Sequence, residues 1–593
     1  MTDAPQKSVQ WNFTAETNAE GRTYIKAYKM GWDKVAKKPR RVMRRHVGRL
    51  MNDGRIAMSP KFLLDHPQYE GQDWYWGAQR KPVSLAEYLN DFPDTPGTDA
   101  DAEDQELLPT LSVGLTWAAW QIACKHKIYE HLREVFGAET GRALLHLAIY
   151  KLAGGTAMSS YELWRQQVWL PENIRLSGQK ISEILASVTK DDLVAYFKQR
   201  HEHRIEIRRN RLEKQSELKG GKIEYALDST SISTYSDTNT LAQYGHAKRD
   251  PELKQINQTF VCDQRSGDIL FVHLYDGAVN DVASLQDVLM SMHSAGFDLS
   301  DNILVTDRGY CSLLNVQKMI NMQLAFVQGV RRSENVIDGM FAKHKQQLQN
   351  GAFYNGHLKA SAFTYEEPWQ QDTLAGRLNS KVYVHLYRLD ERFEQQRELI
   401  WKNADEIIEL KSHNRRVPQD QWDSFGRFIV ERTDKSGRTH FSIDAKRMDE
   451  ASEKATQFVL RSNCISNPFE ALEIYRHRTM VEQDFNALKN WLDGERLRVG
   501  TKSMYGKVFV QTLATSLRML MLFTAKQMLV RNPSWRIPND SLDCMFKTMD
   551  LVKADRRKNA NAWVRNTIPA KRRRCFELLE LPEPPRVLRV GSR

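Results

Sequence analysis

The segment Ile474–Asn490 reads IYRHRTMVEQDFNALKN, and the rest of the chain can be interpreted from it. It contains neither proline nor glycine and is rich in good helix formers, so it predicts a single helix. Tyr475, Arg478, Glu482 and Lys489 occupy offsets zero, three, seven and fourteen within it. At about 100° per residue, their side chains fall within an arc of roughly 60° on one helix face.

This face presents a phenol, a guanidinium, a carboxylate and an ammonium group in a row. A carboxylate between two cations can bind a metal ion while the cations hold phosphate groups. The alternative is a solvated helix face whose charges recur at heptad spacing and have no chemical role. The segment alone leaves both interpretations open.

The composition fits a large protein with an anionic partner. The chain has 593 residues, 41% of them hydrophobic, and a formal net charge of +12. About three or four domains are expected at this length. The positive charge suits nucleic acid, although a generic basic surface is an equal alternative. Six cysteines are scattered without a C-x-x-C pair, and the N-terminus lacks the apolar core of a secretory signal. We therefore expect a reducing, cytoplasmic environment.

Residues 1–92 predict a small basic β-rich module, in which Arg22–Met30 and Arg40–Val47 are strands. The cations of this module include Arg40, Arg41, Arg44 and Arg45. They predict a contact surface for a phosphate backbone, or else a solvated hairpin. Residues 93–106 are acidic and predict a linker, and residues 107–221 predict an α-helical domain. The apolar stretch Val508–Val530 is broken by polar residues, so we expect a buried helix and no membrane span.

The middle of the chain alternates strands and helices in the manner of an α/β sheet. The expected elements begin with a strand at Lys222–Ser233, a hairpin of Gln258–Cys262 with Ile269–Tyr275, and a helix at Asp281–Ala295. They continue with a strand at Ile303–Thr306, a helix that starts near Ser312, and a strand at Leu324–Val330. Asp228 lies on the first strand, and Asp307 follows Ile303–Thr306 directly. The carboxyl ends of such strands are where ligands bind in α/β sheets.

Asp228 and Asp307 can lie side by side if their strands are neighbours, and a helix over that edge can add Glu482. Three such carboxylates repel one another unless cations bind between them. Two Mg²⁺ ions suit the oxygen ligands and can cleave a phosphodiester. Each aspartate by itself is also an ordinary turn or cap residue.

With these motifs in order, the sequence resembles a bacterial insertion-sequence transposase of the DDE type. It is similar to the group whose signature is Tyr, two residues, Arg, three residues, Glu, six residues, Lys, which Tyr475, Arg478, Glu482 and Lys489 match at every spacing. LDSTSIS around Asp228 and VTDRGY around Asp307 resemble the two aspartate motifs. The resemblance spans about Lys222–Tyr505.

The resemblance implies a ribonuclease H-like α/β core with a large mostly-β insertion, preceded by the β-rich module and the helical domain. The core would comprise residues 222–330 and 469–507, with the insertion at 331–468. Residues 508–593 would form a helical region with a basic tail and a possible role in dimerisation. Three tryptophans of the insertion, Trp369, Trp401 and Trp422, are candidates for stacking a flipped base, and no local motif selects among them.

The resemblance also implies the chemistry. Asp228, Asp307 and Glu482 would bind Mg²⁺, for which Mn²⁺ can substitute, and Tyr475, Arg478 and Lys489 would contact DNA phosphates. The two N-terminal domains would recognise terminal inverted repeats of double-stranded DNA, and a homodimer would cut both ends in a bacterial, nucleoid-associated setting. Two alternatives are a metal-dependent nuclease without strand transfer and a non-catalytic DNA-binding derivative.

Overall fold

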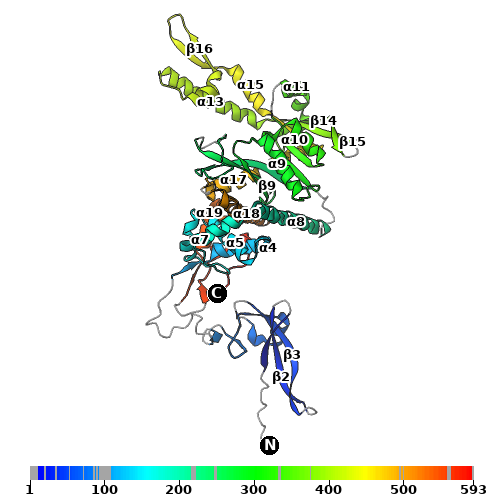
Figure 1. The fold of residues 1–593 in the computed structure, drawn as a ribbon, viewed down its shortest axis with the longest axis vertical. Helices are drawn as coiled ribbons and strands as arrows, with labels where there is room; N and C mark the ends of the chain where they lie inside the picture. Colours follow the sequence, from blue (N-terminus) through cyan, green and yellow to red (C-terminus); the bar gives the residue numbers. More distant parts are fainter. Residues whose placement is uncertain are drawn as a thin grey trace. The chain divides into compact units, whose positions relative to one another are not determined.

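The computed structural model describes residues 11–18, 22–33, 37–51, 54–70, 72–84, 87–88, 91, 109–214, 222–245, 250, 252–331, 335–373, 376–492, 494, 496–497, 500–556 and 562–589 (Figure 1). The chain divides into two compact units. The first comprises Met1–Lys127, Ile149–Lys180 and Thr524–Arg593, and the second comprises Ile128–Ala148 and Ile181–Phe523. The predicted linker 93–106 lies outside the described residues. The predicted helical domain 107–221 is shared between the two units and does not form a unit of its own.

The N-terminal part of the first unit is an antiparallel sheet in the order β1-β2-β3-β4. Its strands are Asn12–Thr17, Thr23–Asp33, Lys38–Leu50 and Ile56–Met58. Ile25, Ala27 and Val47 are buried on one face against Phe62 of helix α1 (Pro60–Asp65). The two expected strands are therefore present, and the long β2–β3 hairpin, blue in Figure 1, leaves its arginines exposed. Shorter elements follow at η1 (Pro67–Tyr69), β5 (Tyr75–Trp76) and β6 (Pro82–Val83).

The remainder of the first unit combines helices with a sheet in the order β21-β20-β19-β7. Its elements are β7 (Leu111–Ser112), α3 (Gly114–Lys125), η2 (Met158–Ser160), α6 (Tyr161–Arg165), η7 (Pro538–Asp540), α19 (Leu542–Asp550), β19 (Lys553–Asp555), β20 (Ala562–Arg565), α20 (Ala570–Leu578) and β21 (Val587–Arg589). The expected basic tail is folded where the structure describes it. Arg573 on α20 pairs with Glu583, and Arg574 lies 3.8 Å from the ring centre of Trp535.

The second unit is built on a nine-stranded sheet in the order β10-β9-β8-β11-β12-β18-β15-β14-β13. The first five strands are the predicted core strands: β8 (Ile223–Thr234), β9 (Lys254–Asp263), β10 (Ile269–Asp276), β11 (Asn302–Thr306) and β12 (Ala325–Gly329). β8, β11 and β12 are parallel neighbours, and β9 and β10 are antiparallel. Helices α9 (Asp281–Ser294) and α10 (Leu313–Asn321) connect them (Figure 1). This arrangement agrees with the expected α/β core.

The insertion is mixed, so the expectation of a mostly-β segment was wrong. Strands β13 (Tyr354–Asn355), β14 (Ala360–Thr373), β15 (Gly376–Leu389) and β18 (Gln457–Ser462) extend the core sheet, and β16 (Ile429–Thr433) pairs with β17 (Thr439–Ile443). Helices are α11 (Asn335–Lys343), α12 (Lys345–Gln349), α13 (Glu391–Ser412), α14 (Gln419–Phe425) and α15 (Ala445–Thr456), with short turns η4 (Gly351–Phe353) and η5 (Gly426–Phe428). The 22 residues of α13 are rich in Glu, Gln, Lys and Arg, which favour a helix over a strand.

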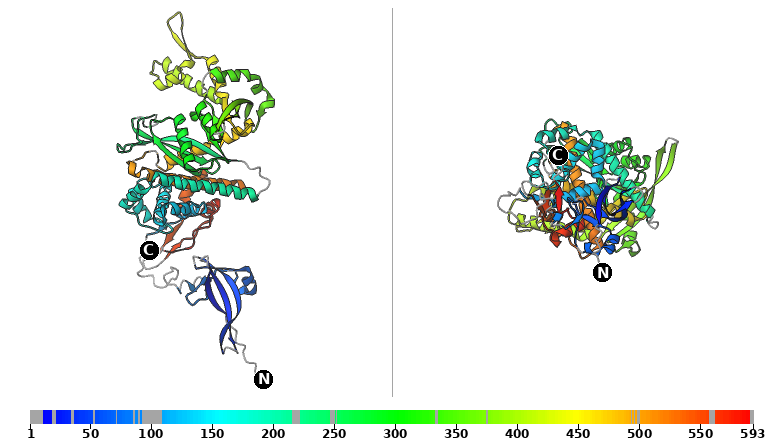
Figure 2. Two further views of the ribbon diagram at one scale, coloured as in Figure 1. Left: turned by 45° about the vertical axis from the view of Figure 1, so that its right-hand side comes forward. Right: turned by 90° about the horizontal axis from the view of Figure 1, so that it is seen from below.

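Long helices complete the second unit: α4 (Ile128–Phe136), α7 (Gly178–Ser187) and α8 (Lys190–Lys214), with parts of α5 (Ala138–Leu152) and α18 (Thr501–Arg531). α8, the long teal helix of Figure 2, packs on β10. Its buried Arg200 pairs with Asp268. Among the described residues α18 is long and apolar enough to cross a membrane, but 89% of its most apolar window is buried, as in a core helix.

Candidate active site

The register of the core sheet brings two of the predicted acids together. Thr306 on β11 is the register partner of Leu227 on β8, so Asp228 and Asp307, the next residues, meet at the same sheet edge. Each carboxylate accepts the N–H of the following residue, Ser229 at 2.8 Å and Arg308 at 2.7 Å. These hydrogen bonds fix the orientation of both side chains.

The predicted single helix at Ile474–Asn490 is divided. Helix α16 (Pro468–Arg476) ends before Arg478, α17 (Thr479–Asn486) follows, and a π-helical turn spans Ala487–Trp491. At the junction the backbone bonds become i to i−3, as in the 3.1 Å bond from the Arg478 N–H to the Tyr475 carbonyl. The tight turn directs Arg478 toward the sheet edge, where its side chain has acidic partners.

Each helix is held by its apolar face. Ala471, Leu472 and Ile474 of α16 are buried in one cluster with strands of both the core and the insertion. On α17, Phe485 stacks on Phe260 of β9 with ring centres 4.9 Å apart. Because these faces are fixed, Glu482 lies on the outward face of α17, and its side chain is 55% exposed.

Arg478 joins all three predicted acids. Its guanidinium donates to Asp228 Oδ2 at 3.0 Å and to Glu482 Oε1 at 2.6 Å, and it lies 4.0 Å from Asp307 Oδ1. Tyr475 donates its hydroxyl to Asp307 Oδ1 at 3.1 Å. Four of the predicted site residues and Arg478 therefore form one connected polar cluster. The predicted contact of Arg478 with a DNA phosphate stays a prediction, and the structure adds its pairing with the acids.

The electrostatics of the cluster are those of crowded carboxylates. Burial raises the pKa of Asp228 to about 6, and the charges of Asp307 and Asp281 add to that effect. The Arg478 guanidinium and the Ser229 N–H act in the opposite direction. A partly buried carboxyl with a raised pKa between acidic neighbours is a position that a cation stabilises.

The donor chemistry fits a hard divalent cation. Asp228, Asp307 and Glu482 offer carboxylate oxygens, which Mg²⁺ and Mn²⁺ prefer. Across the described ranges, however, no group of three acidic, histidine or cysteine side chains is close enough to hold a metal ion as it stands. Arg478 lies between Asp228 and Glu482 and supplies the compensating positive charge instead.

Residues 219–504 match the family model of the transposase DDE domain. The match supports a DDE transposase with a ribonuclease H-like core, and its bounds nearly coincide with the resemblance at Lys222–Tyr505. A solved structure with similarity is a cryo-EM structure of a piggyBac transposase synaptic complex with hairpin DNA, at 10% identity and a TM-score of 0.30. That comparison covers 70% of this chain and 72% of the other, and so low a TM-score establishes no shared fold. The comparison with curated proteins found no match.

The other predicted residues lie on different elements from the three acids. Lys489 lies on the π-helical turn and is partly exposed. Arg40, Arg41, Arg44 and Arg45 are exposed on β3 of the first unit. Trp422 packs under Lys411 at 3.9 Å, whereas Trp401 is 52% exposed. These positions leave the question of a base-stacking tryptophan open.

The sequence interpretation missed Asp281, the first residue of α9. Ser229 donates its hydroxyl to Asp281 Oδ1 at 2.5 Å, which places a fourth carboxylate beside Asp228. The signal was hidden because Asn280-Asp281 reads as an ordinary helix start, and Asn280 does cap α9 by accepting the Ala283 N–H. Asp281 therefore supports the strand that carries Asp228.

Asp484 is a second residue that the sequence did not single out. It lies two positions after Glu482 on α17 and is fully buried, and the buried Cys262 thiol interacts with its carboxylate. Burial raises its pKa well above the usual range, the Cys262 thiol lowers it in part, and the nearby Asp268 and Asp263 raise it further. Burial and the two neighbouring acids favour the protonated, neutral form of Asp484 inside the domain.

We expect Asp484→Asn to stabilise the domain increasingly as pH rises. Below about pH 4 Asp484 is protonated in both the folded and the unfolded parent chain, so its charge costs the folded state no stability. Above that pH the unfolded chain releases a proton that the folded chain retains, and stability is lost until the folded pKa is reached. The free energy of unfolding of the variant should gain about 1.4 kcal/mol per pH unit over the parent.

Urea unfolding in EDTA at pH 5, 6 and 7 measures this gain. Asp301→Asn serves as the control, because Asp301 is exposed in the turn before β11. A difference between parent and Asp484→Asn that stays constant with pH would contradict a protonated Asp484.

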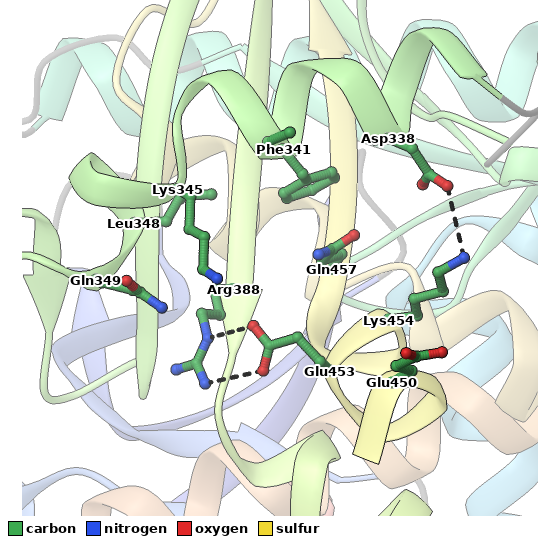
Figure 3. Close-up of a pocket in the computed structure, with 11 residues that line it drawn as sticks. Asp338, Phe341, Lys345, Leu348, Gln349, Arg388, Glu450, Glu453, Lys454 and Gln457 are labelled. Atoms are coloured by element: carbon green, nitrogen blue, oxygen red, sulfur yellow. Dashed lines mark hydrogen bonds and ion pairs between the residues drawn. The ribbon is translucent and has the colours of Figure 1, made fainter. Parts of the chain in front are cut away.

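A pocket of about 340 Å³ lies in the insertion, between α11, α12 and α15 (Figure 3). Phe341 and Leu348 form its apolar part. Two ion pairs lie in its lining: Arg388 binds Glu453 through two N–H groups, at 3.3 and 3.4 Å, and Lys454 lies 3.7 Å from Asp338. This pocket contains none of the predicted site residues.

Proposed function

We propose that this chain is a cut-and-paste transposase of the Tyr-Arg-Glu-Lys group. It would bind the terminal inverted repeats of its own insertion sequence, cleave the ends by hydrolysis and join the 3′-hydroxyl ends to target DNA. The observation that supports this best is the meeting of Asp228, Asp307 and Glu482 around Arg478, inside the residues that match the DDE domain.

Asp228, Asp307 and Glu482 are the residues that would hold two Mg²⁺ ions, for which Mn²⁺ can substitute. When bound, such ions make a nucleophile from water or a 3′-hydroxyl at neutral pH and stabilise the leaving oxygen of the phosphodiester. Tyr475 keeps the Asp307 carboxylate oriented through its hydroxyl. Ser229 and Asp281 support the strand that carries Asp228 in the same way.

Arg478 has two roles in this proposal. Without a divalent cation its guanidinium neutralises Asp228 and Glu482, as the hydrogen bonds of 3.0 and 2.6 Å describe. If the acids were neutralised by bound Mg²⁺, the Arg478 guanidinium would be free to bind a DNA phosphate, for which its planar fork of N–H groups is well suited. Lys489, seven residues or about two turns beyond Glu482 along the same segment, adds a second phosphate contact.

Recognition of the DNA ends falls to the regions before the catalytic domain. The exposed Arg40, Arg41, Arg44 and Arg45 give the N-terminal sheet a basic surface, and the helices within 107–221 would add contacts. Two ends have to be cut together, so a homodimer on paired ends in the bacterial cytoplasm, associated with the nucleoid, completes the proposal.

The test is an assay of cutting and joining with purified protein, Mg²⁺, a labelled duplex carrying the terminal repeat of the element, and a target plasmid. The repeat is identified from inverted repeats that flank the gene. We expect cleavage at the repeat boundary and labelled ends joined to the plasmid. Cleavage without joined product would favour a nuclease on the same fold. Binding without cleavage would favour a non-catalytic derivative.

A further inference from the structure

A pocket of about 300 Å³ adjoins the candidate active site on the side of the insertion. Its lining comes from α16 and the turn after it, from the start of α13, from β15 and β18, and from the segment before β14. The residues that matter for its chemistry are Lys359, Glu391, Arg392, Phe458, Tyr475, Arg476 and Arg478. Two of these residues, Tyr475 and Arg478, also contact the predicted acids. The pocket and the carboxylates therefore share a wall.

A stack of side chains connects the pocket rim to the carboxylates. The Arg392 guanidinium lies 5.4 Å from the ring centre of Phe458, which lies 5.2 Å from the ring of Tyr475. Arg478 in turn lies 5.6 Å from the Tyr475 ring. At one end of the stack, Arg478 is bound by the acids. At the other end, the aromatic rings hold the Arg392 guanidinium in a defined position.

Two of the four cations of the lining have acidic partners. Arg478 is bound by Asp228 and Glu482, and Lys359 pairs with Glu391, the one carboxylate of the lining, at 2.5 Å. Within the described part of the chain, Arg392 and Arg476 form no ion pair, and Arg476 donates only to the Leu358 carbonyl at 3.1 Å. Burial lowers the pKa of Arg392, and the positive charges of Arg308 and Arg476 lower it further. Such a group of guanidinium ions is stabilised by an anion.

We propose that this pocket binds a backbone phosphate of the DNA strand that enters the active site, with Arg392 and Arg476 as its ligands. The inference rests on the proposed function and adds a DNA contact that comes from the insertion. A volume of about 300 Å³ is roughly ten times the share of one water molecule in the liquid, so a phosphate enters together with its sugar. The shared wall then places the neighbouring phosphodiester toward the three carboxylates.

The test is a scan of single methylphosphonates, which neutralise one phosphate at a time, across the repeat boundary of the duplex. Binding is measured by fluorescence anisotropy in Ca²⁺, with the full chain and with Arg392→Gln and Arg476→Gln. The parent should lose about tenfold in affinity at one or two positions, because a charge-assisted contact is lost there. Both variants should bind more weakly and no longer respond at those positions. For each variant, the slope of the logarithm of the binding constant against the logarithm of the salt concentration should become about 0.9 less steep.

Arg397→Gln is the matched control, because Arg397 lies on the same helix α13 outside the pocket and neighbours Glu394 at 3.9 Å. It should reproduce the parental scan. An Arg392→Gln scan identical to the parental one would overturn the proposal while leaving DNA binding by the parent intact. Failure of the parent to bind the duplex at all would instead count against the proposed function. Inorganic phosphate is titrated separately by calorimetry. If the parent binds it and Arg392→Gln does not, while no methylphosphonate position changes the parent's affinity for the duplex, the pocket binds free phosphate and the DNA contact is overturned.

Discussion

Asp307→Asn is expected to lower the rate of cleavage at the repeat boundary at least about 1,000-fold, because removing one carboxylate ligand costs several kcal/mol of transition-state stabilisation. The substitution keeps the shape of the side chain. The amide oxygen can still accept the Arg308 N–H and the Tyr475 hydroxyl, which Asp307 accepts at 2.7 and 3.1 Å. The fold and the affinity for the duplex should therefore be nearly unchanged.

Rates of strand cleavage in Mg²⁺, with binding measured in parallel, check this expectation. The control is Asp301→Asn, which removes a carboxylate from the turn before the same strand and should cut like the parent. Cleavage by Asp307→Asn within about tenfold of the parent would show that this acid is not a metal ligand.

Replacing Arg40, Arg41, Arg44 and Arg45 together by Gln should produce the second large effect, on DNA binding. These side chains are exposed on β3, and Arg40 is 74% exposed, so their removal leaves the core of the module intact. Each phosphate contact contributes about 0.9 to the salt-dependence slope, so four contacts contribute about 3 to 4. At physiological salt this corresponds to a loss of about 10²-fold or more in affinity.

Titrations of the labelled duplex at several salt concentrations measure both the affinity and the slope of its salt dependence. Arg55→Gln is the control within the same module, because Arg55 lies outside β3 and is 3.4 Å from Asp73, closer than Arg40 is to Asp33 at 3.8 Å. An unchanged slope in the fourfold variant would mean that the β2–β3 hairpin is a solvated surface, and end recognition would have to be sought in the helices.

The core could be predicted from the sequence because its signals are local. Apolar strands, a hairpin turn and an acid directly after Ile303–Thr306 specify β8 to β12, whereas the pairing of β8 with β11, which makes Asp228 and Asp307 neighbours, is seen only in the structure. The break at Arg478 could not be predicted in this way. Local propensity favours one helix through Ile474–Asn490, and the tight turn depends on hydrogen bonds to acids that are distant in sequence.

The insertion illustrates the same limit. The apolar residues of Val382–Leu389 are a local signal for a strand, but the pairing of β18 with both β12 and β15 joins segments far apart in the chain. No pattern in the sequence states which strand becomes a neighbour. Helix α13, with few buried residues, was missed because its polar sequence was treated as part of a β-rich region.

The continuous sheet has a mechanical consequence. Because β18 is hydrogen-bonded to β12 on one side and to β15 on the other, the insertion cannot swing about a hinge at its root without breaking backbone hydrogen bonds of the catalytic sheet. Arg392, which follows β15 at the start of α13, is thus carried on a rigid arm and not on a lid. A DNA phosphate bound to Arg392 would be held at a fixed distance from the acids. The sheet would thereby determine which phosphodiester of the strand is cut.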